Sequence, residues 1–248
     1  MVDRNILSYA RPEQILPRGA EVVLPDAYFH EMAEAKRDEE LDGFVTWIRK
    51  HAETVWIARY WWDLLKDERR SSSMASPTQI ISEEWTRSLR AHAKDGEFAW
   101  PGDERQEFYE KCKAEFIGRS RAWTERVADH GIDLSAERSS EDCLRELLRA
   151  PDPIQPHVRK WEPEFMLKSW SHCVGVFPDR PAICRWWRII NYYTIMHSLG
   201  ETAIFENNWE DAQYAFTASY VGRLATDDKR LIEMMDRIFP GVTIFTSD

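Results

Sequence analysis

The chain has 248 residues, of which 43% are hydrophobic and 12% aromatic, and this composition excludes a largely disordered protein. No apolar run reaches the roughly 18–20 residues that a membrane-spanning helix needs, and no signal-peptide pattern opens the chain, so we expect a cytoplasmic protein without a membrane partner. The net charge of −10 repels nucleic acid on average, so bulk electrostatics give no support to nucleic-acid binding.

The sequence lacks the motifs of several kinds of catalytic or cofactor site. Its four cysteines form no CxxC pair, which argues against a zinc knuckle and against a disulfide framework. No GxGxxG or GxxxxGK segment is present, and this weakens a nucleotide-dependent dehydrogenase or a P-loop ATPase. The seven dispersed histidines have neither zinc-ligand spacing nor a nucleophile motif beside them.

The first 40 residues alternate strand and helix signals. We predict a strand at residues 1–2, a small helix over 12–16, a β-branched strand over 21–24 and a helix from residue 27. Asp26 precedes that helix, so its carboxylate can cap the free amides of the first turn.

Residues 41–199 show long helical periodicity and few strand candidates, and we predict a large all-helical insertion there. Basic and aromatic residues are interleaved in three segments of the chain, where arginines and exposed rings could contact RNA. These segments are 87–94, 119–126 and 180–188. The favoured interpretation is packing, because tryptophans at helical spacing usually lie in a core and mixed charges usually form a solvated face.

The last 40 residues return to alternating elements. We predict a helix over 209–221, a strand over 223–226, a helix over 229–238 and a strand over 242–245. Such alternation is typical of an α/β fold with a small parallel sheet flanked by helices. We therefore expect residues 1–40 and 200–248 to form one domain, with 41–199 as a helical subdomain packed on it.

Four acidic residues from both ends of the chain are candidates for a single site. Asp3 and Asp228 come just after predicted strands, and the carboxyl ends of parallel strands form the crevice where open α/β sheets bind ligands. Asp211 lies in the first turn of a predicted helix with small residues on the same face, so we expect its carboxylate to face inward. Glu31 occupies a similar place on the helix that begins near residue 27.

Carboxylates that share a pocket need a counter-ion. Two of them about 4 Å apart repel by roughly 4 kcal/mol at an effective dielectric near 20. Mg²⁺ or Mn²⁺ removes this repulsion, because these ions prefer oxygen ligands completed by water and substrate phosphate. The alternative for each acid alone is a helix cap or a solvated turn, but the strand ends and the chain order of all four favour a metal site.

The same residues resemble the motifs of PIN domains, a family of metal-dependent nucleases. Residues 3–7 (Asp-Arg-Asn-Ile-Leu) look like the family's opening D-x-N-hydrophobic motif, and Glu31 sits where the family has a helix-borne glutamate. Asp211-Ala212 is similar to its D-A helix start, and residues 226–228 to its T-x-D motif. The resemblance covers about residues 1–40 and 200–248. Arg4 stands where the family usually has Thr or Ser.

This resemblance implies hydrolysis of a phosphodiester by water held on a divalent ion, leaving 5′-phosphate and 3′-hydroxyl ends. The implied catalytic and metal-binding residues are Asp3, Glu31, Asp211 and Asp228. Asn5 and Thr226 would orient them through hydrogen bonds, and Asp227 is an alternative to Asp228. The implied cofactor is Mg²⁺ or Mn²⁺.

The resemblance also implies the partners. We expect RNA or single-stranded DNA as the substrate, most simply RNA for an endoribonuclease, and an antitoxin-like protein as a candidate inhibitor. The alternative is an inactive PIN-like scaffold that binds a protein or RNA partner through the Trp-rich helical insertion. Arg4 and the acidic net charge keep this alternative open.

Overall fold

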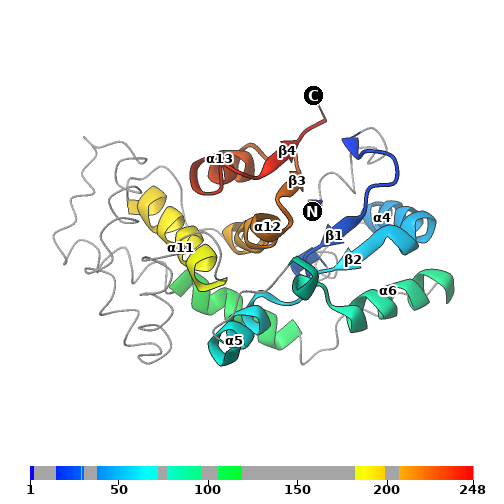
Figure 1. Cartoon of the computed structure of the whole chain (residues 1–248), viewed down its shortest axis with the longest axis horizontal. Helices are drawn as coiled ribbons and strands as arrows, with labels where there is room; N and C mark the ends of the chain where they lie inside the picture. The colour runs from blue at the N-terminus through cyan, green and yellow to red at the C-terminus, as the bar shows by residue number, and fades with distance from the viewer. Residues whose placement is uncertain are drawn as a thin grey trace. The chain divides into compact units, whose positions relative to one another are not determined.

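The structure, a computed structural model, is mixed α/β and mostly helical (Figure 1). It describes residues 1–2, 15–28, 30, 38–71, 77–95, 106–118, 182–198 and 207–247. The chain divides into two compact units, the first being Met1–Trp61, Ser76–Glu110 and Gln213–Asp248, and the second Trp62–Ala75 and Lys111–Ala212. Within the described ranges, no helix combines the length and the apolar character that crossing a membrane requires.

The described residues of the first unit form four short strands. Strand β1 (Val22–Leu24) pairs in parallel with β2 (Val55–Ile57), and β3 (Arg223–Ala225) pairs in parallel with β4 (Thr243–Phe245). Further elements of this unit are helices α4 (Asp38–His51), α6 (Glu83–Asp95) and α13 (Lys229–Ile238), and the 3-10 segments η1 (Ala52–Thr54) and η2 (Pro77–Ile80). Strands β1 and β2 have a buried residue at each end and a half-buried one between, and this explains their continuous apolar sequences. In β3 and β4, Arg223 and Thr243 are exposed.

Residues 1–2 join the two pairs of strands. Val2 donates its N–H to the carbonyl of Val23 in β1 at 3.3 Å, and the carbonyl of Met1 accepts from the N–H of Ala225 in β3 at 3.0 Å. Val2 also forms a parallel bridge with Ala225. The hydrogen-bonded order is therefore β2, β1, residues 1–2, β3, β4, with the beginning of the chain at the centre.

The buried amine of Met1 makes the stability of this unit depend on pH. Burial, and secondly the charge of Arg223, lower the pKa of the amine from 8.0 to about 5. Between these values the unfolded chain binds the proton and the folded chain does not, so the free energy of unfolding rises with pH, by up to roughly 4 kcal/mol from this group.

Chemical unfolding tests this effect on protein that has Met1 as its first residue. We expect higher stability at about pH 8.5 than at about pH 5.5. Acetylation of the amine provides the control, because it removes the titrating group and should flatten this part of the pH dependence. An equal slope in both proteins would contradict the assignment.

Gly222 links helix α12 (Asn207–Val221) to β3. Its φ of 74° lies in the left-handed region, and its N–H donates to the carbonyl of Ala218 at 2.8 Å, ending the helix. Its own carbonyl accepts from Thr243 at 3.0 Å, so the turn is tied to β4 as well.

Helix α6 closes the outer edge of β2. The N–H of Ile57 donates to Oγ1 of Thr86 at 3.0 Å, and Nη2 of Arg90 donates to the carbonyl of Val55 at 3.3 Å. The carbonyl of Ile57 accepts from the N–H of Ser82 at 2.8 Å. These bonds satisfy backbone groups that an edge strand otherwise exposes to pairing with another chain.

The variant Thr86→Val tests this closure. Valine keeps the shape of the side chain but leaves the buried N–H of Ile57 without its acceptor, so we expect a loss of about 1–3 kcal/mol of unfolding free energy in urea. Thr46→Val is the matched control, because Thr46 is exposed on α4. Equal effects of the two substitutions would contradict a role for the Thr86 hydroxyl.

Strand β2 corrects the prediction that residues 41–199 are helical throughout. A strand of three residues is too short to display a period of two, and Val55 and Trp62 also fit the spacing of one helix face. The sheet therefore continues into the stretch that was expected to be an all-helical insertion.

The predictions near the chain ends agree better with the structure. Helix α13 has the predicted bounds, and β1, β3, β4 and α12 lie within about two residues of theirs. The strand predicted at residues 1–2 is present as the bridge of Val2. Residues 12–14 of the helix predicted over 12–16 lie outside the described residues.

The described residues of the second unit are helical. It contains most of α5 (Trp61–Ser71), helical residues 111–118, α11 (Ala182–Ser198) and the first turns of α12. The ring of Phe116 contacts those of Trp209 at 5.3 Å and Trp186 at 6.0 Å between centroids, and the two tryptophans meet edge to face. Beside these rings, Nζ of Lys113 lies 2.9 Å from Oε1 of Glu210, and both side chains are buried. Among the described residues of this unit, the core thus combines aromatic packing with the Lys113–Glu210 ion pair.

Candidate functional site

The turn after β3 carries the Thr226-Asp227-Asp228 motif. Thr226 is fully buried, and its Oγ1 accepts the N–H of Asp228 at 3.0 Å. Oδ1 of Asp228 accepts from the N–H groups of Arg230 at 2.7 Å and Leu231 at 3.1 Å, so Asp228 is the N-cap of α13. Asp228 therefore caps a helix, which was the alternative expected for each acid alone.

Capping leaves part of the Asp228 carboxylate available. Both backbone bonds end on Oδ1, and no described residue donates to Oδ2. Asp227 differs, because its Oδ1 and Oδ2 accept from the N–H and Oγ of Ser247 at 2.8 and 2.7 Å. Of these two acids, Asp228 thus has the carboxylate oxygen without a donor among the described residues.

Asp211 lies on the second turn of α12 and is half-buried, so its carboxylate is less enclosed than expected. The buried acid of this helix is the preceding residue, Glu210, held by Lys113. Sequence reasoning missed this pair, because the two residues are far apart in the chain and neither stands in a recognisable motif.

The other predicted site residues lie outside the described part of the chain. They are Asp3, Asn5 and Glu31. Among the described residues, no group of three or more His, Cys, Asp or Glu side chains is placed to hold a metal ion. The convergence of the four acids therefore stays a prediction. The structure pairs Val2, which directly precedes Asp3 in the chain, with Ala225, which directly precedes Thr226.

Asp26 is an acid that the sequence interpretation treated only as a helix cap. It follows β1 by two residues and is 5% exposed. A buried carboxylate at the carboxyl end of a central strand belongs among the candidates for the site, because that end of a parallel strand is where such sheets bind ligands. Its position after the predicted strand was the available signal.

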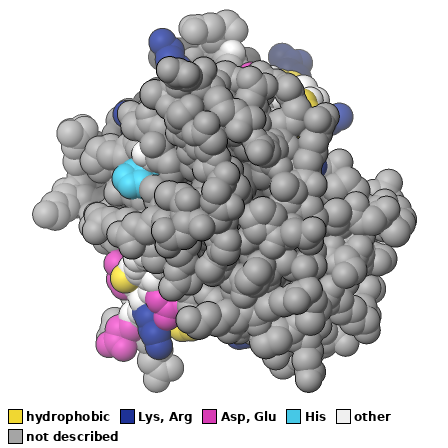
Figure 2. Space-filling view, turned by 90° about the vertical axis from the view of Figure 1, so that its left-hand side faces the viewer, with side chains coloured by type: hydrophobic (Ala, Val, Ile, Leu, Met, Phe, Trp, Pro, Cys, Tyr) yellow, Lys and Arg dark blue, Asp and Glu magenta, His cyan; other side chains and the backbone are white. Residues whose placement is uncertain are grey.

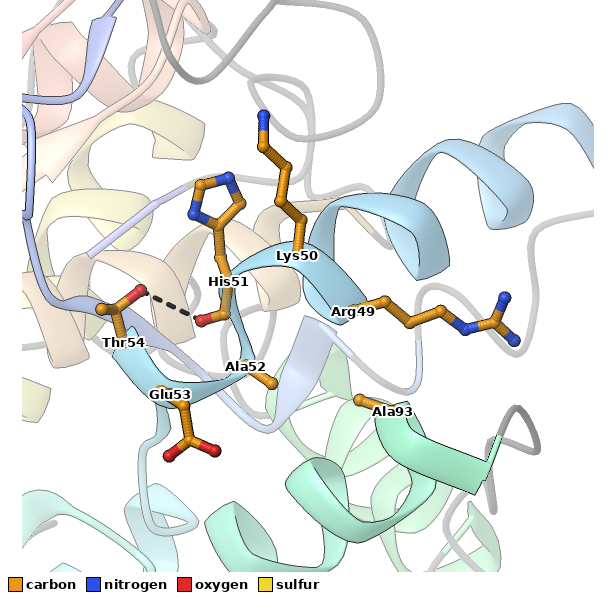
Figure 3. Close-up of a pocket in the computed structure, with 7 residues that line it drawn as sticks. All are labelled: Arg49, Lys50, His51, Ala52, Glu53, Thr54 and Ala93. Carbon is orange, nitrogen blue, oxygen red and sulfur yellow. Dashed lines mark hydrogen bonds between the residues drawn. The ribbon is translucent and has the colours of Figure 1, made fainter.

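A cavity of about 260 Å³ lies at the amino end of β2, where α4 ends (Figure 3). The charged ends of Arg49, Lys50 and Glu53 point away from one another there. Thr54 donates its hydroxyl to the carbonyl of His51 at 3.0 Å. Basic residues in the last turn of a helix are favoured by the helix dipole, so these side chains suit a helix terminus better than a catalytic site.

A second cavity, of about 590 Å³, lies between β2 and α6. On its wall, the guanidinium of Arg90 stacks over the ring of Trp56 at 4.5 Å. The same group donates to the carbonyls of Ala52 at 2.9 Å and Glu53 at 3.0 Å. The hydrogen bonds of Arg90 therefore stabilise the backbone of residues 52–55. This agrees with the interpretation that segment 87–94 serves packing.

Of the other two basic and aromatic segments, 180–188 also agrees with packing where it is described, and 119–126 cannot be compared. Trp186 is buried in the aromatic core of the second unit, and segment 119–126 lies outside the described residues. Figure 2 shows acidic and basic side chains lying next to one another on one face of the molecule. Where it is described, this face carries mixed charge.

No protein-family model matches the chain, and no curated protein or solved structure matches it. What the protein does must therefore be inferred from its own residues and their geometry.

Proposed function

We propose that the chain is a divalent-metal-dependent nuclease with a PIN-like domain, and that its substrate is RNA. The order of the strands carries this proposal. Residues 1–2 are hydrogen-bonded to the two-stranded sheet of β1 and β2 on one side and to that of β3 and β4 on the other, so the chain order of the strands reverses there. Open α/β sheets bind ligands at the carboxyl ends of the strands beside such a reversal.

Two motifs begin at this point of the sheet. Asp3 follows Val2 in the chain, Thr226 follows Ala225, and Val2 and Ala225 are paired. These two segments come from opposite ends of the sequence. Both carry the oxygen ligands that Mg²⁺ or Mn²⁺ prefers.

The described chemistry of Asp228 fits a hard cation. Oγ1 of Thr226 holds the backbone N–H of Asp228, and the first turn of α13 holds Oδ1, so Oδ2 is the carboxylate oxygen to which no described residue donates. Asp3, Glu31 and Asp211 would complete the set, with Asn5 as a hydrogen-bond partner. When bound, the ion would supply a water of lowered pKa and neutralise phosphate charge.

The test is cleavage of labelled single-stranded RNA and DNA by purified protein with Mn²⁺, Mg²⁺ or EDTA. We expect RNA cleavage that needs the metal and leaves 5′-phosphate ends. Thermal melting with and without Mn²⁺ gives an independent reading of metal binding. If the protein neither cleaves RNA nor is stabilised by the metal, the proposal is wrong.

An inactive scaffold is the competing proposal. It would use tryptophans of the helical stretch to bind a partner. Of these, Trp186 is only 7% exposed and packs against Phe116 and Trp209. An inhibitory protein partner fits the nuclease proposal and would be recognised as a stoichiometric block of RNA cleavage.

A further inference from the structure

Strand β4 uses one edge of its backbone to pair with β3. The N–H of Thr243 donates to the carbonyl of Gly222 at 3.0 Å, and the carbonyl of Phe245 accepts from the N–H of Thr226 at 3.0 Å. Alternate residues of a strand direct their backbone N–H and carbonyl groups to opposite edges. The backbone groups of residues 242, 244 and 246 therefore point away from β3, and β4 ends the hydrogen-bonded strand order on this side (Figure 1).

The outer edge of β4 presents backbone donors and acceptors that no described residue uses. They are the N–H groups of Ile244 and Thr246 and the carbonyls of Val242 and Ile244. The N–H of Val242 is engaged, because it donates to the carbonyl of Phe239 at 2.9 Å in the turn after α13. Thr246 is exposed, and Val242 and Ile244 are half-buried, so this edge is accessible to another strand.

The other end of the strand order is protected, whereas β4 is not. Helix α6 satisfies outer backbone groups of β2 through Thr86 and Arg90. Residues 242–246 have the sequence Val-Thr-Ile-Phe-Thr, which lacks the charges and the proline that usually protect an edge strand. Its β-branched and aromatic residues favour strand pairing. The outer edge of β4 thus has the properties of a surface that adds a further strand.

We propose that β4 pairs in antiparallel orientation with β4 of a second copy of this chain, about a two-fold axis at Ile244. The free groups match under this symmetry. Ile244 of each copy donates to and accepts from Ile244 of the other, and the N–H of Thr246 donates to the carbonyl of Val242. Uncharged side chains face one another across the axis, and such cross-strand pairs are favourable. This pairing is independent of the proposed function.

A second copy is the expected occupant because the pairing is self-complementary and closed. Helix α6 covers the outer edge of β2, so β4 of one copy does not add to β2 of the next, and an open chain of copies does not form. Pairing of β4 with itself uses the open edges of both copies at once. The contact spans one short strand, so we expect a weak dimer whose interface is small for a specific one.

The first test is the dissociation constant of the dimer, measured by sedimentation equilibrium over a range of protein concentrations. Thr246→Pro removes an outward N–H at a position where an edge strand tolerates proline. We expect this variant to raise the dissociation constant by about tenfold or more, because two hydrogen bonds are lost in each dimer. Thr246→Val is the matched control, because it keeps the N–H, and it should dimerise like the wild type.

The variants Ile244→Lys and Ile244→Glu test the two-fold axis itself. In either variant alone, like charges face each other across the axis and should prevent dimerisation. Mixing the two purified variants brings opposite charges face to face and should restore association. Hydrogen exchange of the wild type gives a reading that needs no substitution, because the N–H of Ile244 should be protected at high protein concentration and exchange faster at low concentration.

Two results would overturn the pairing. A wild type that stays monomeric at every concentration would leave the edge of β4 to a strand of another protein. A dimer that is unchanged by Thr246→Pro, together with Ile244→Lys and Ile244→Glu variants that do not associate when mixed, would place the interface elsewhere. Neither measurement uses RNA or metal, so the failure of this inference is distinguishable from the failure of the proposed function.

Discussion

Replacing Asp228 by asparagine is expected to lower metal-dependent RNA cleavage by about 100-fold or more while the protein stays folded. Asparagine and aspartate are comparable N-caps, so the side-chain oxygen can still accept from Arg230 and Leu231. The substitution removes the negative charge that a divalent ion requires. The measurement is kcat/KM with Mn²⁺ and single-stranded RNA, and thermal melting in EDTA checks the fold.

Two further variants give this experiment its controls. Asp3→Asn should cause a comparable loss, because the proposal makes Asp3 a second ligand of the same ion and Val2, which precedes it, pairs with Ala225. Asp227→Asn should stay near the wild type, because the Asp227 carboxylate is engaged with Ser247. Equal cleavage by the wild type, Asp3→Asn and Asp228→Asn would point to a contaminating nuclease, and a loss confined to Asp227→Asn would reverse the assignment of the two adjacent acids.

Removal of Glu210 is expected to destabilise the second unit by about 3–5 kcal/mol, because it leaves the charge of Lys113 buried without its partner. The pair is short, at 2.9 Å, and the two side chains are only 9% and 8% exposed. Urea unfolding of Glu210→Leu measures the loss. We expect little effect on the hydrogen-bonded strand order, which belongs to the first unit.

A double variant and a surface pair complete the comparison. Lys113→Met combined with Glu210→Leu should recover most of the stability, because apolar side chains of similar volume can replace a buried ion pair. Glu233→Ala breaks the exposed pair of Glu233 with Arg237 on α13 and should cost less than about 1 kcal/mol. A loss for Glu210→Leu no larger than that for Glu233→Ala would contradict the burial argument.

Elements with strong local signals were predictable from the sequence. Helix α13 has a capping aspartate at its start and buries Leu231, Met234, Met235 and Ile238 along one face, so both its bounds and its apolar stripe follow from spacing. The strands at the chain ends were predictable too, because turn residues and helices bracket them. In the same way, the sequence placed Asp228 directly beyond a strand.

Features that depend on distant residues were not predictable. Strand β2 exists because Val55–Ile57 pairs with β1 and because α6 covers its other edge, and neither partner is visible locally. The Lys113–Glu210 pair and the contact of His30 with Tyr109 likewise join segments far apart in the sequence. The hydrogen-bonded strand order, with residues 1–2 at its centre, likewise depends on contacts between distant segments and was not predictable.

The most direct test of the central claim is a crystal structure of the protein grown with Mn²⁺, in which anomalous scattering locates the ion. We predict a Mn²⁺ peak within about 2.3 Å of carboxylate oxygens of Asp3 and Asp228, at the carboxyl ends of residues 1–2 and β3. A structure in which these two carboxylates point apart, with no ion between them at saturating Mn²⁺, would contradict the claim.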